Sequence, residues 1–462
     1  MPTLSSDRNP ALARGSFPSG YLFVALSCSS PLRGASRHRL EAVGEVRLGR
    51  ASSFVARRST DQGRAVLTLG IPDERVSSSH ARILAEADGA WRLEDLGSKN
   101  GSYLNGVTVR LSSLADGDLI QVGQTLIVFR RALTTPVGTS DDVEIGPPAS
   151  AFATLLPSLV QDFESLAAVA KTEIPVLLVS ETGTGKEVVA RAVHALSRRA
   201  GAFVPVNCGA LTATLAESIL FGHRRGAFSG ATTDHAGLLR SAEGGTVLFD
   251  ELGDMSLGLQ PTLLRVLQER EVLPVGAVTP VPLRVRFVAA THRNLDALVS
   301  AGSFREDLFA RLAGYVFRLP PLRERREDIG LLTSVVLHKI AEATGRQPRL
   351  SAEAGALLFD YDWPRNVREL EKCLEQAVLF AGEGQIEPRH LPADVRSGSR
   401  ERGRPRRKAI PMEDAKRARL LALLTEHRGN LQAVADALET SRSQVHRWLH
   451  RFEIDVEPFR SH

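Results

Sequence analysis

An apolar run, a short glycine-containing loop and a helical stretch follow one another near the middle of the chain. Residues 174–179 are typical of a buried parallel strand, and residues 188–197 have helical character. Small residues in the intervening loop let backbone N–H groups close on phosphate oxygens, and the following helix N-terminus adds positive potential. The residues predicted to bind a nucleotide here are Ser180, Glu181, Thr182, Gly183, Thr184, Gly185, Lys186 and Glu187, with Lys186 reaching the terminal phosphates.

This loop departs from the general phosphate-binding pattern at both ends. Ser180 stands in place of the first glycine, and Glu187 stands where a hydroxyl residue would contact Mg²⁺. By itself the loop is also compatible with a surface turn.

A second element favours nucleotide hydrolysis. The apolar strand 244–249 ends in two acids, of which Asp250 can hold Mg²⁺ and Glu251 can activate the attacking water. The alternative is a strand that ends in a solvated turn. The loop and the acidic pair together predict an ATPase with ATP and Mg²⁺ as cofactors.

Three arginines further along the chain are candidates for contacting the γ-phosphate. Arg305 and Arg311 share one helical segment, and either could act as an arginine finger in the site of a neighbouring subunit. Arg368 could contact phosphate from a helical lid. The alternative for each is an ordinary surface or ion-paired arginine.

The organisation of the chain follows from composition and periodicity. Residues 21–132 have short strand patterns separated by turns, which favours a β-sandwich. Residues 155–318 alternate strand and helix patterns, as in a parallel α/β sheet, and residues 319–395 are helical. A second helical unit spans 413–462. Between these units we expect a flexible N-terminus at 1–20, a linker at 133–154 and a basic linker at 396–412; the strands expected in the sandwich are 22–26, 45–48, 65–69, 81–85, 91–95, 119–122 and 125–129.

Composition limits the class of protein. The chain has 462 residues, of which 43% are hydrophobic and 24% charged, as in ordinary globular proteins. It has no run of about 18 apolar residues, so neither a membrane-spanning helix nor a membrane partner is expected. The three cysteines lie far apart, which argues against a disulfide scaffold and suits a reducing cytoplasm. The basic linker can either touch phosphate nonspecifically or serve as a solvated tether.

The C-terminal unit contains two amphipathic helical patterns joined by a tight turn. Apolar residues recur at helical spacing within 431–438 and again within 445–452, which favours a helix-turn-helix. Polar side chains of the second helix could then contact bases and phosphates in a major groove. The alternative is a helical hairpin used for dimerisation. The predicted DNA contacts are Arg442, Ser443, Gln444, His446, Arg447 and Arg451.

The β-sandwich segment carries polar residues at loop and strand-end positions. Arg50 supplies a bidentate charged donor, Ser77 a hydroxyl and Asn100 an amide, a set that suits a phosphate ester and a peptide backbone. Each residue alone is common in turns. The ordered set, together with Ser98, resembles the forkhead-associated (FHA) domain, which implies binding of phosphothreonine proteins.

Two features depart from the FHA pattern. The family's Ser-Arg-x-His motif has Ser78 at the arginine position in this chain, and the stretch between Arg50 and Ser77 is longer than expected. His80 is expected to brace the loop rather than to contact the ligand.

Residues 155–392 resemble the central AAA+ domain of bacterial enhancer-binding proteins, which activate sigma-54 RNA polymerase. Glu187 is ordinary in that family. The resemblance rests on the phosphate loop and on further motifs in the family's order: 203–208, 220–223, 226–231, 249–251, 304–312, 319–325 and 363–370.

One loop identifies the subfamily within the AAA+ proteins. It is small and glycine-rich with a single aromatic residue, and in the family it engages sigma-54 and moves with the nucleotide state. An ordinary turn is the alternative. The resemblance also implies that Asn207 couples Glu251 to this loop and that Thr291 and His292 sense the nucleotide. The loop consists of Gly226, Ala227, Phe228, Ser229, Gly230 and Ala231.

The chain departs from the family's usual residues at several positions, but none of the changes removes Lys186, Asp250 or Glu251. We therefore expect activity. The departures are Ser180 and Arg365 in place of Gly, Arg224 in place of Glu, Ser229 in place of Thr and His292 in place of Asn.

Taken together, the resemblances imply a cytoplasmic, ATP-driven transcription activator. Residues 429–448 resemble a Fis-type domain, which would bind an enhancer-like site in double-stranded DNA as a dimer. The AAA+ domain would assemble into a hexameric ring and act on sigma-54 RNA polymerase, under control of the FHA domain. The alternatives are a non-hydrolysing, phosphopeptide-responsive DNA-binding regulator and an AAA+ remodeller of another client.

Overall fold

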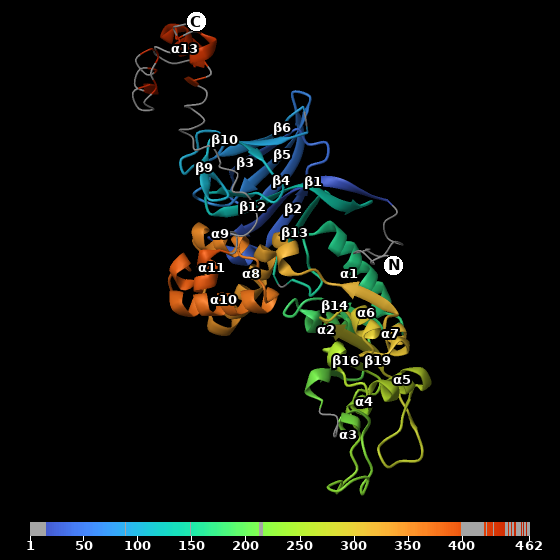
Figure 1. The fold of residues 1–462 in the computed structure, drawn as a ribbon. Helices are drawn as coiled ribbons and strands as arrows, with labels where there is room; N and C mark the ends of the chain where they lie inside the picture. The colour runs from blue at the N-terminus through green and yellow to red at the C-terminus, as the bar shows by residue number, and fades with distance from the viewer. Residues whose placement is uncertain are drawn as a thin grey trace. The chain divides into compact units, whose positions relative to one another are not determined.

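A computed structural model describes most of the chain. Contacts group it into two compact units, Met1–Glu41 with Arg130–Arg400, and Ala42–Phe129 with Glu401–His462 (Figure 1). The described residues are 15–87, 89–147, 149–211, 216–398, 420–421, 423–427, 429–438, 442, 445, 448, 449, 454, 456 and 459.

The first unit begins with part of a β-sandwich. Strand β1 (Ser16–Ser27) pairs antiparallel with β2 (Ala35–Arg39), and β2 pairs antiparallel with β13 (Asp142–Ile145). The end of β12 (Thr125–Pro136) completes this part of the sheet.

Two of the expected linker boundaries are wrong. Strand β1 already begins at Ser16, within the N-terminus expected to be flexible. The segment 133–154, expected to be a linker, contains the end of β12 and all of β13. Strand β13 has no buried residue, and its backbone pairing with β2 and the 2.8 Å hydrogen bond between His38 and Asp142 hold it in place.

The rest of the β-sandwich lies in the second unit. A six-stranded sheet has the order β10-β7-β6-β3-β5-β4, while β11 pairs with β12 and β8, and β8 pairs with β9. The expected β-sandwich is therefore confirmed. The strands are β3 (Glu45–Arg50), β4 (Val55–Asp61), β5 (Arg64–Ile71), β6 (Ala81–Ala85), β7 (Trp91–Asp95), β8 (Ser102–Leu104), β9 (Val107–Val109), β10 (Leu111–Leu114) and β11 (Leu119–Val122).

The α/β core is built on a five-stranded parallel sheet of order β15-β16-β19-β14-β20. Its strands are β14 (Val176–Val179), β15 (Phe203–Asn207), β16 (Thr246–Asp250), β19 (Arg286–Thr291) and β20 (Tyr315–Arg318). Because all of these strands run in the same direction, the residues that follow them meet at one edge of the sheet.

Helices cover both faces of this sheet. Leu177 packs in a cluster with Leu263 of α5, whereas Val176 and Leu178 pack in a cluster with Phe163 of α1 and side chains of α2. The alternation follows from the strand period of two residues. The helices are α1 (Pro157–Ala170), α2 (Lys186–Leu196), α3 (Ala216–Phe221), α4 (Leu238–Ser241), α5 (Gln260–Glu269), α6 (Leu295–Ser300) and α7 (Glu306–Leu312).

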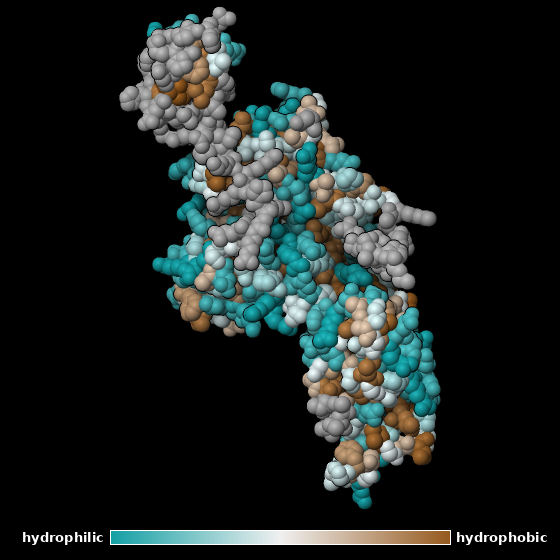
Figure 2. Space-filling model, in the orientation of Figure 1, coloured by the Kyte–Doolittle hydropathy of each residue, from teal (hydrophilic) through white to brown (hydrophobic). Residues whose placement is uncertain are grey.

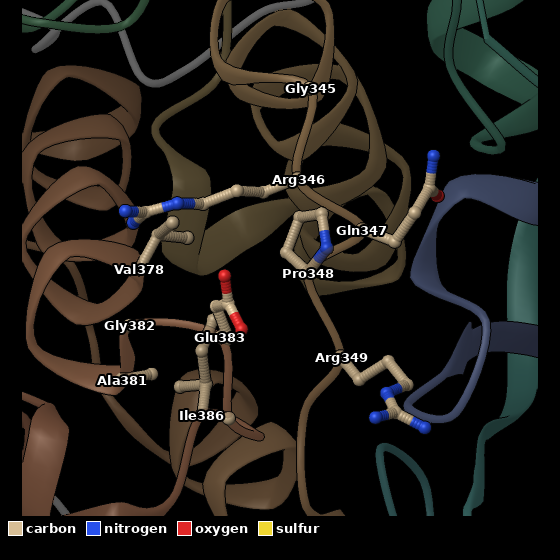
Figure 3. Close-up of a pocket in the computed structure, with 11 residues that line it drawn as sticks. Gly345, Arg346, Gln347, Pro348, Arg349, Val378, Ala381, Gly382, Glu383 and Ile386 are labelled. Atoms are coloured by element: carbon tan, nitrogen blue, oxygen red, sulfur yellow. The ribbon is translucent and has the colours of Figure 1, made fainter.

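A helical lid follows β20, as the sequence predicts. Two short 3₁₀ turns, η4 (Leu322–Glu324) and η5 (Arg326–Asp328), lead into the helices α8 (Ile329–Thr344), α9 (Ala352–Asp360), α10 (Asn366–Ala381) and α11 (Ala393–Ser397). A cavity of about 330 Å³ lies where α8 and α10 end. Figure 3 shows Arg346 and Glu383 on its walls, and no residue predicted to bind nucleotide lines it.

The C-terminal helical unit is described only in part. Leu424, Leu431, Val434, Val445 and Leu449 are buried in one cluster, with α13 spanning Leu431–Ala437. This confirms that the two apolar patterns pack together. Arg442 is exposed, whereas the other predicted DNA contacts, Ser443, Gln444, His446, Arg447 and Arg451, and all but 396–398 of the basic linker lie outside the described residues.

Two further features are absent from the part of the chain that the structure describes. No helix there has the length and apolar character needed to cross a membrane. The same residues contain no group of three or more His, Cys, Asp or Glu side chains able to hold a metal ion. The three cysteines, Cys28, Cys208 and Cys373, are all buried.

Gly330 in α8 offers a test of the packing between this helix and β1. A Cβ atom at Gly330 would overlap the carbonyl oxygen of Ala25. Gly330→Ala should lower the stability of the full chain by about 1–3 kcal/mol despite the better helix propensity of alanine. Gly258, where a Cβ would meet nothing within 4 Å, provides the control Gly258→Ala. Urea unfolding followed by fluorescence measures both, and equal midpoints would contradict the packing described here.

Candidate functional site

The phosphate loop lies between β14 and α2. Helix α2 begins at Lys186, and its N-cap Gly185 has φ 107°, a left-handed conformation that favours glycine. A Cβ at Gly185 would meet nothing within 4 Å, so the backbone faces open space. The Nζ of Lys186 donates to the carbonyl oxygens of Ser180 and Glu181, at 3.0 Å each. The loop thus has the open geometry expected of a phosphate-binding loop, and nucleotide binding by its residues stays a prediction.

The acidic pair lies close to this lysine. Burial lowers the pKa of Lys186, while the charges of Asp250 and Glu251 raise it and that of Arg368 lowers it further. These charges therefore lie within electrostatic range of one another. Glu251 has φ 54°, an uncommon conformation for a residue other than glycine, and its N–H donates to Oδ1 of Asp250 at 2.9 Å. The arrangement suits ATP hydrolysis at the end of β16.

Asn207 ends the neighbouring strand. In the sheet its Cα lies opposite that of Asp250, and its Oδ1 accepts hydrogen bonds from the N–H groups of Gly209 and Ala210 at 2.9 and 3.1 Å. A Cβ at Gly209 would lie 3.0 Å from Oε2 of Glu251 and 3.4 Å from Oδ1 of Asn207. Asn207 and Glu251 thus both approach the same glycine, and their coupling stays a prediction.

The two residues predicted to sense nucleotide differ in their surroundings. Thr291 is buried, and its carbonyl oxygen accepts a hydrogen bond from the N–H of Ser180 at 3.1 Å, which ties β19 to the phosphate loop. The side chain of His292 is exposed. Thr291 therefore supports the loop directly.

Two lid residues, Arg323 and Asn366, also bond the phosphate loop. Neither was predicted from the sequence as a site residue. Arg323 forms a bidentate ion pair with Glu181, at 2.8 and 2.6 Å, and its hydrogen bonds lower the pKa of Glu181. The Nδ2 of Asn366 donates to the carbonyl oxygen of Thr182 at 3.0 Å. The carboxylate of Glu181, predicted to bind nucleotide, is thus engaged with the lid. The pairing of β14 with β20 brings the lid to the loop, and no local sequence pattern carries that information.

The two candidate arginine fingers lie at opposite ends of α7. Arg305 is the N-cap residue and forms a bidentate ion pair with Asp307, at 3.0 and 2.7 Å. Arg311 lies in the last turn, and its Nη2 approaches the carbonyl oxygen of Leu267 at 3.4 Å. Both lie on the same short helical segment, as predicted, and their action in a neighbouring subunit stays a prediction.

The loop Gly226–Ala231 lies between α3 and α4 and reaches away from the α/β core, beside the segment that follows α5 (Figure 1). The N–H of Gly226 donates to the carbonyl oxygen of Ala231 at 2.8 Å, which closes the loop. Figure 2 shows hydrophobic residues on this end of the core, where Phe228 is 40% and Val278 96% exposed. The expected exposed aromatic residue is therefore present.

Residues at the base of the loop hold its shape. The ring of Phe228 packs edge-on against His223 at 5.0 Å, and His223 stacks on His235 at 5.6 Å. Arg224, which reverses the family's usual charge, forms a 2.5 Å ion pair with Asp234. Hydrogen bonds from the Arg225 N–H and from Arg224 lower the pKa of Asp234. The unusual charge at Arg224 thus has a compensating partner across the loop.

The predicted phosphopeptide residues lie on connected loops of the β-sandwich. The N–H of Arg50 donates to the carbonyl oxygen of Ser77 at 2.9 Å, and Oγ of Ser77 accepts from the N–H of Lys99 at 3.1 Å. The Nδ2 of Asn100 donates to the carbonyl oxygen of Arg75 at 2.7 Å. The loops carrying Arg50, Ser77 and Asn100 are therefore brought together.

His80 and Ser98 take part in holding these loops. His80 is fully buried, with Nδ1 accepting from the N–H of Ser77 at 3.0 Å and Nε2 lying 3.2 Å from the carbonyl oxygen of Gly101. Burial lowers its pKa, which favours the neutral ring. The expected bracing role of His80 is confirmed. The hydroxyl of Ser98 donates to Asp95 at 2.6 Å and so is engaged within the loop.

Comparison with protein-family models gives matches along most of the chain. Residues 154–318 match the Sigma-54 interaction domain, and residues 323–408 match an AAA+ ATPase lid domain. Residues 46–123 match the FHA domain, and residues 411–458 match a Homeodomain-like domain.

Three curated relatives match half or more of the chain. SfnR of Pseudomonas putida, a Sigma54-dependent transcriptional activator, is 44% identical over 53% of this chain and 70% of its own length. HoxA of Cupriavidus necator, a hydrogenase transcriptional regulatory protein, is 42% identical over 63% of each chain. The regulatory protein AtoC of Escherichia coli is 40% identical over 65% of this chain and 67% of its own. The matched part of the chain thus spans about two thirds of the length of these relatives.

Glu251→Gln tests the division of roles within the ATP site. The amide keeps the size of the side chain but cannot accept a proton from water, so hydrolysis should fall by ~10²–10⁴-fold while ATP affinity is retained. Lys186→Ala should instead lose ATP binding. Steady-state turnover and equilibrium binding of ATP separate these two effects, and wild-type turnover by Glu251→Gln would contradict the role of Glu251.

Proposed function

Because the chain belongs to the family of sigma-54-dependent transcriptional activators, we propose that it uses ATP hydrolysis to remodel sigma-54 RNA polymerase for promoter opening. The observation that carries the proposal is the loop Gly226–Ala231, which presents Phe228 from a core that also carries Lys186, Asp250 and Glu251. An AAA+ remodeller of another client would have no need of this loop.

Residues at the edge of the parallel sheet would carry out the hydrolysis. Lys186 would bind the terminal phosphates, and Arg368, whose charge acts on Lys186, would contact them from the lid. Asp250 would hold Mg²⁺, because a carboxylate at the end of a strand is a suitable hard oxygen ligand. The ion would neutralise developing charge on the phosphates. Glu251 would orient and deprotonate water.

The nucleotide state would reach the sigma-54 loop through the edge of the sheet. Asn207 and Glu251 both approach Gly209, so a change in the position of Glu251 would alter the surroundings of Asn207. Thr291 and His292 would respond to the nucleotide from the end of β19. The exposed Phe228 would then transmit the movement to the sigma factor.

Assembly would complete the ATP site. Either Arg305 or Arg311 would reach the γ-phosphate of ATP bound to a neighbouring subunit. If every site is completed in this way, the subunits form a closed ring, and the family typically forms a hexamer. Arg305 is exposed, and its ion pair with Asp307 would have to be exchanged for contact with phosphate. Of the two, Arg305 therefore needs the larger rearrangement of its partners.

The flanking domains would supply location and control. The C-terminal unit would bind an enhancer-like DNA site as a dimer, through the second helix that includes Arg442. The FHA loops with Arg50, Ser77 and Asn100 would bind a phosphothreonine protein. A DNA-binding regulator of this family would act in the cytoplasm, with 155–318 as its ATPase core, 319–395 as its lid and 413–462 as its DNA-binding domain.

Opening of a sigma-54 promoter complex by the purified full chain tests the proposal. ATP-dependent opening is expected for the wild type and not for Lys186→Ala or Phe228→Ala, although Phe228→Ala should keep its ATP turnover. Turnover without opening would favour another client. The absence of turnover in a folded, ring-forming wild-type chain would favour a non-hydrolysing regulator.

The ion pair at the base of the loop gives a sharper prediction. Arg224→Glu places two carboxylates opposite each other and should reduce promoter opening several-fold, with ATP turnover preserved. Because both side chains are more than half exposed, stability should change by less than about 1 kcal/mol. The exchanged pair Arg224→Glu with Asp234→Arg should restore opening. If the exchanged pair opened the promoter no better than Arg224→Glu alone, the ion pair would not determine the shape of the loop.

A further inference from the structure

The turn that leads from β20 into α8 is buried and carries several charges. Glu327 is 0% exposed, Asp328 1% and Arg325 5%. Charged side chains are rarely this buried unless they are paired or hydrogen-bonded. The contacts of this turn therefore identify what it holds in place. The contacts that this turn makes with the phosphate loop and with the β-sandwich strands all lie within the first of the two compact units.

One side of the turn holds the phosphate loop. The Nη2 of Arg325 donates to the carbonyl oxygen of Thr184 at 3.0 Å. Burial lowers the pKa of Arg325, and the charge of Asp328 opposes that effect. The Arg325 guanidinium thus bonds the backbone of the phosphate loop and lies within electrostatic range of Asp328.

The other side of the turn holds strands of the β-sandwich. The Nη1 of Arg130, in β12, donates to Oε1 of Glu327 at 2.5 Å. Within the described part of the chain, the second carboxylate oxygen of Glu327 has no hydrogen-bond partner. Arg130 therefore supplies the cation and the hydrogen-bond donor for the fully buried carboxylate of Glu327.

A second set of hydrogen bonds also links the turn to the β-sandwich, through Asp328. Asp328 accepts hydrogen bonds from the hydroxyl of Thr154 and the N–H of Leu155, at 2.7 Å each. Arg37, in β2, donates to the carbonyl oxygen of Leu155 at 2.9 Å. Two strands of the β-sandwich thus approach the same turn, Arg130 directly and Arg37 through Leu155.

The helix that follows the turn is packed against β1, which lies between β2 and β12 in the sheet. The N–H of Leu350, which follows α8, donates to the carbonyl oxygen of Cys28 at 2.9 Å, and Gly330 lies against the backbone of Ala25. The space between α8 and β1 is too small for a methyl group at Gly330. The turn therefore has little freedom to move relative to these strands.

We propose that Arg130 is a positioning residue for the ATP site, which fixes the turn at Glu327–Asp328 so that Arg325 holds the phosphate loop. The inference rests on the proposed function only in taking that loop as the ATP site. Without Arg130, Glu327 would be a buried carboxylate that lacks its cation, and the turn would shift or admit water. Arg325 would then leave the carbonyl oxygen of Thr184.

Arg130→Met in the full chain tests this role. Methionine keeps the length of the apolar stem but removes the charge and the donors. The KM for ATP and the Kd for ATP should rise about tenfold, with kcat changed less than twofold, and Arg130→Lys should recover part of the affinity. Arg131, the exposed neighbour on the same strand, provides the matched control Arg131→Met, which should bind ATP as the wild type does.

A double-mutant cycle separates positioning from a general loss of stability. In an Arg325→Met background the contact to Thr184 is already absent, so Arg130→Met should weaken ATP binding by less than twofold further. Independent, multiplicative effects of the two substitutions would overturn the proposal. So would a lower melting temperature of Arg130→Met with unchanged ATP affinity. Equilibrium binding gives these answers even if the wild type proved unable to hydrolyse ATP, which would refute the proposed function alone.

Discussion

The backbone carbonyl groups of the phosphate loop impose the constraint on which the rest of the ATP site depends. When the N–H groups of a loop are directed at a ligand, its carbonyl oxygens point away from the ligand. They then need hydrogen-bond donors from the surrounding protein. Lys186 donates to the carbonyl groups of Ser180 and Glu181. Asn366, the backbone N–H of Arg368, and Arg325 donate in turn to the carbonyl groups of Thr182, Gly183 and Thr184.

Most of these donors come from the lid, so the lid and the loop are not independent. Gly183 shows how close they are, because a Cβ at that position would overlap the carbonyl oxygen of Arg365. A lid displaced from the core would leave polar groups of the loop without partners, which costs free energy wherever water cannot replace them. The geometry of the nucleotide site is thus set by residues distant in sequence, including Arg130 on a strand of the β-sandwich.

Sequence periodicity located the elements with regular patterns and missed those that lack one. Strands β6, β7 and β11 have the predicted bounds because their apolar residues are bracketed by turn residues. Strand β4, whose residues are all exposed, has no such pattern and is held by its pairing with β5. It accounts for the unexpectedly long stretch between Arg50 and Ser77.

The residues of the ATP site were likewise predictable only where a local sequence pattern marks them. Lys186, Asp250 and Glu251 were identified because local spacing carries their chemistry. Arg325 was not, since its contact depends on the way the chain returns to the phosphate loop after β20. The partner of Arg224 was missed for the same reason, although Asp234 lies only a short way along the chain.

Hydrogen exchange at the backbone amides of residues 181–189, measured without nucleotide, tests most directly whether the lid holds the loop. Arg325→Met removes the donor to Thr184 and should speed this exchange several-fold relative to the wild type, whereas amides of β16 should be unaffected. Saturating ATP should restore much of the protection. Equal exchange of the loop in the wild type and in Arg325→Met would contradict a loop held from the lid.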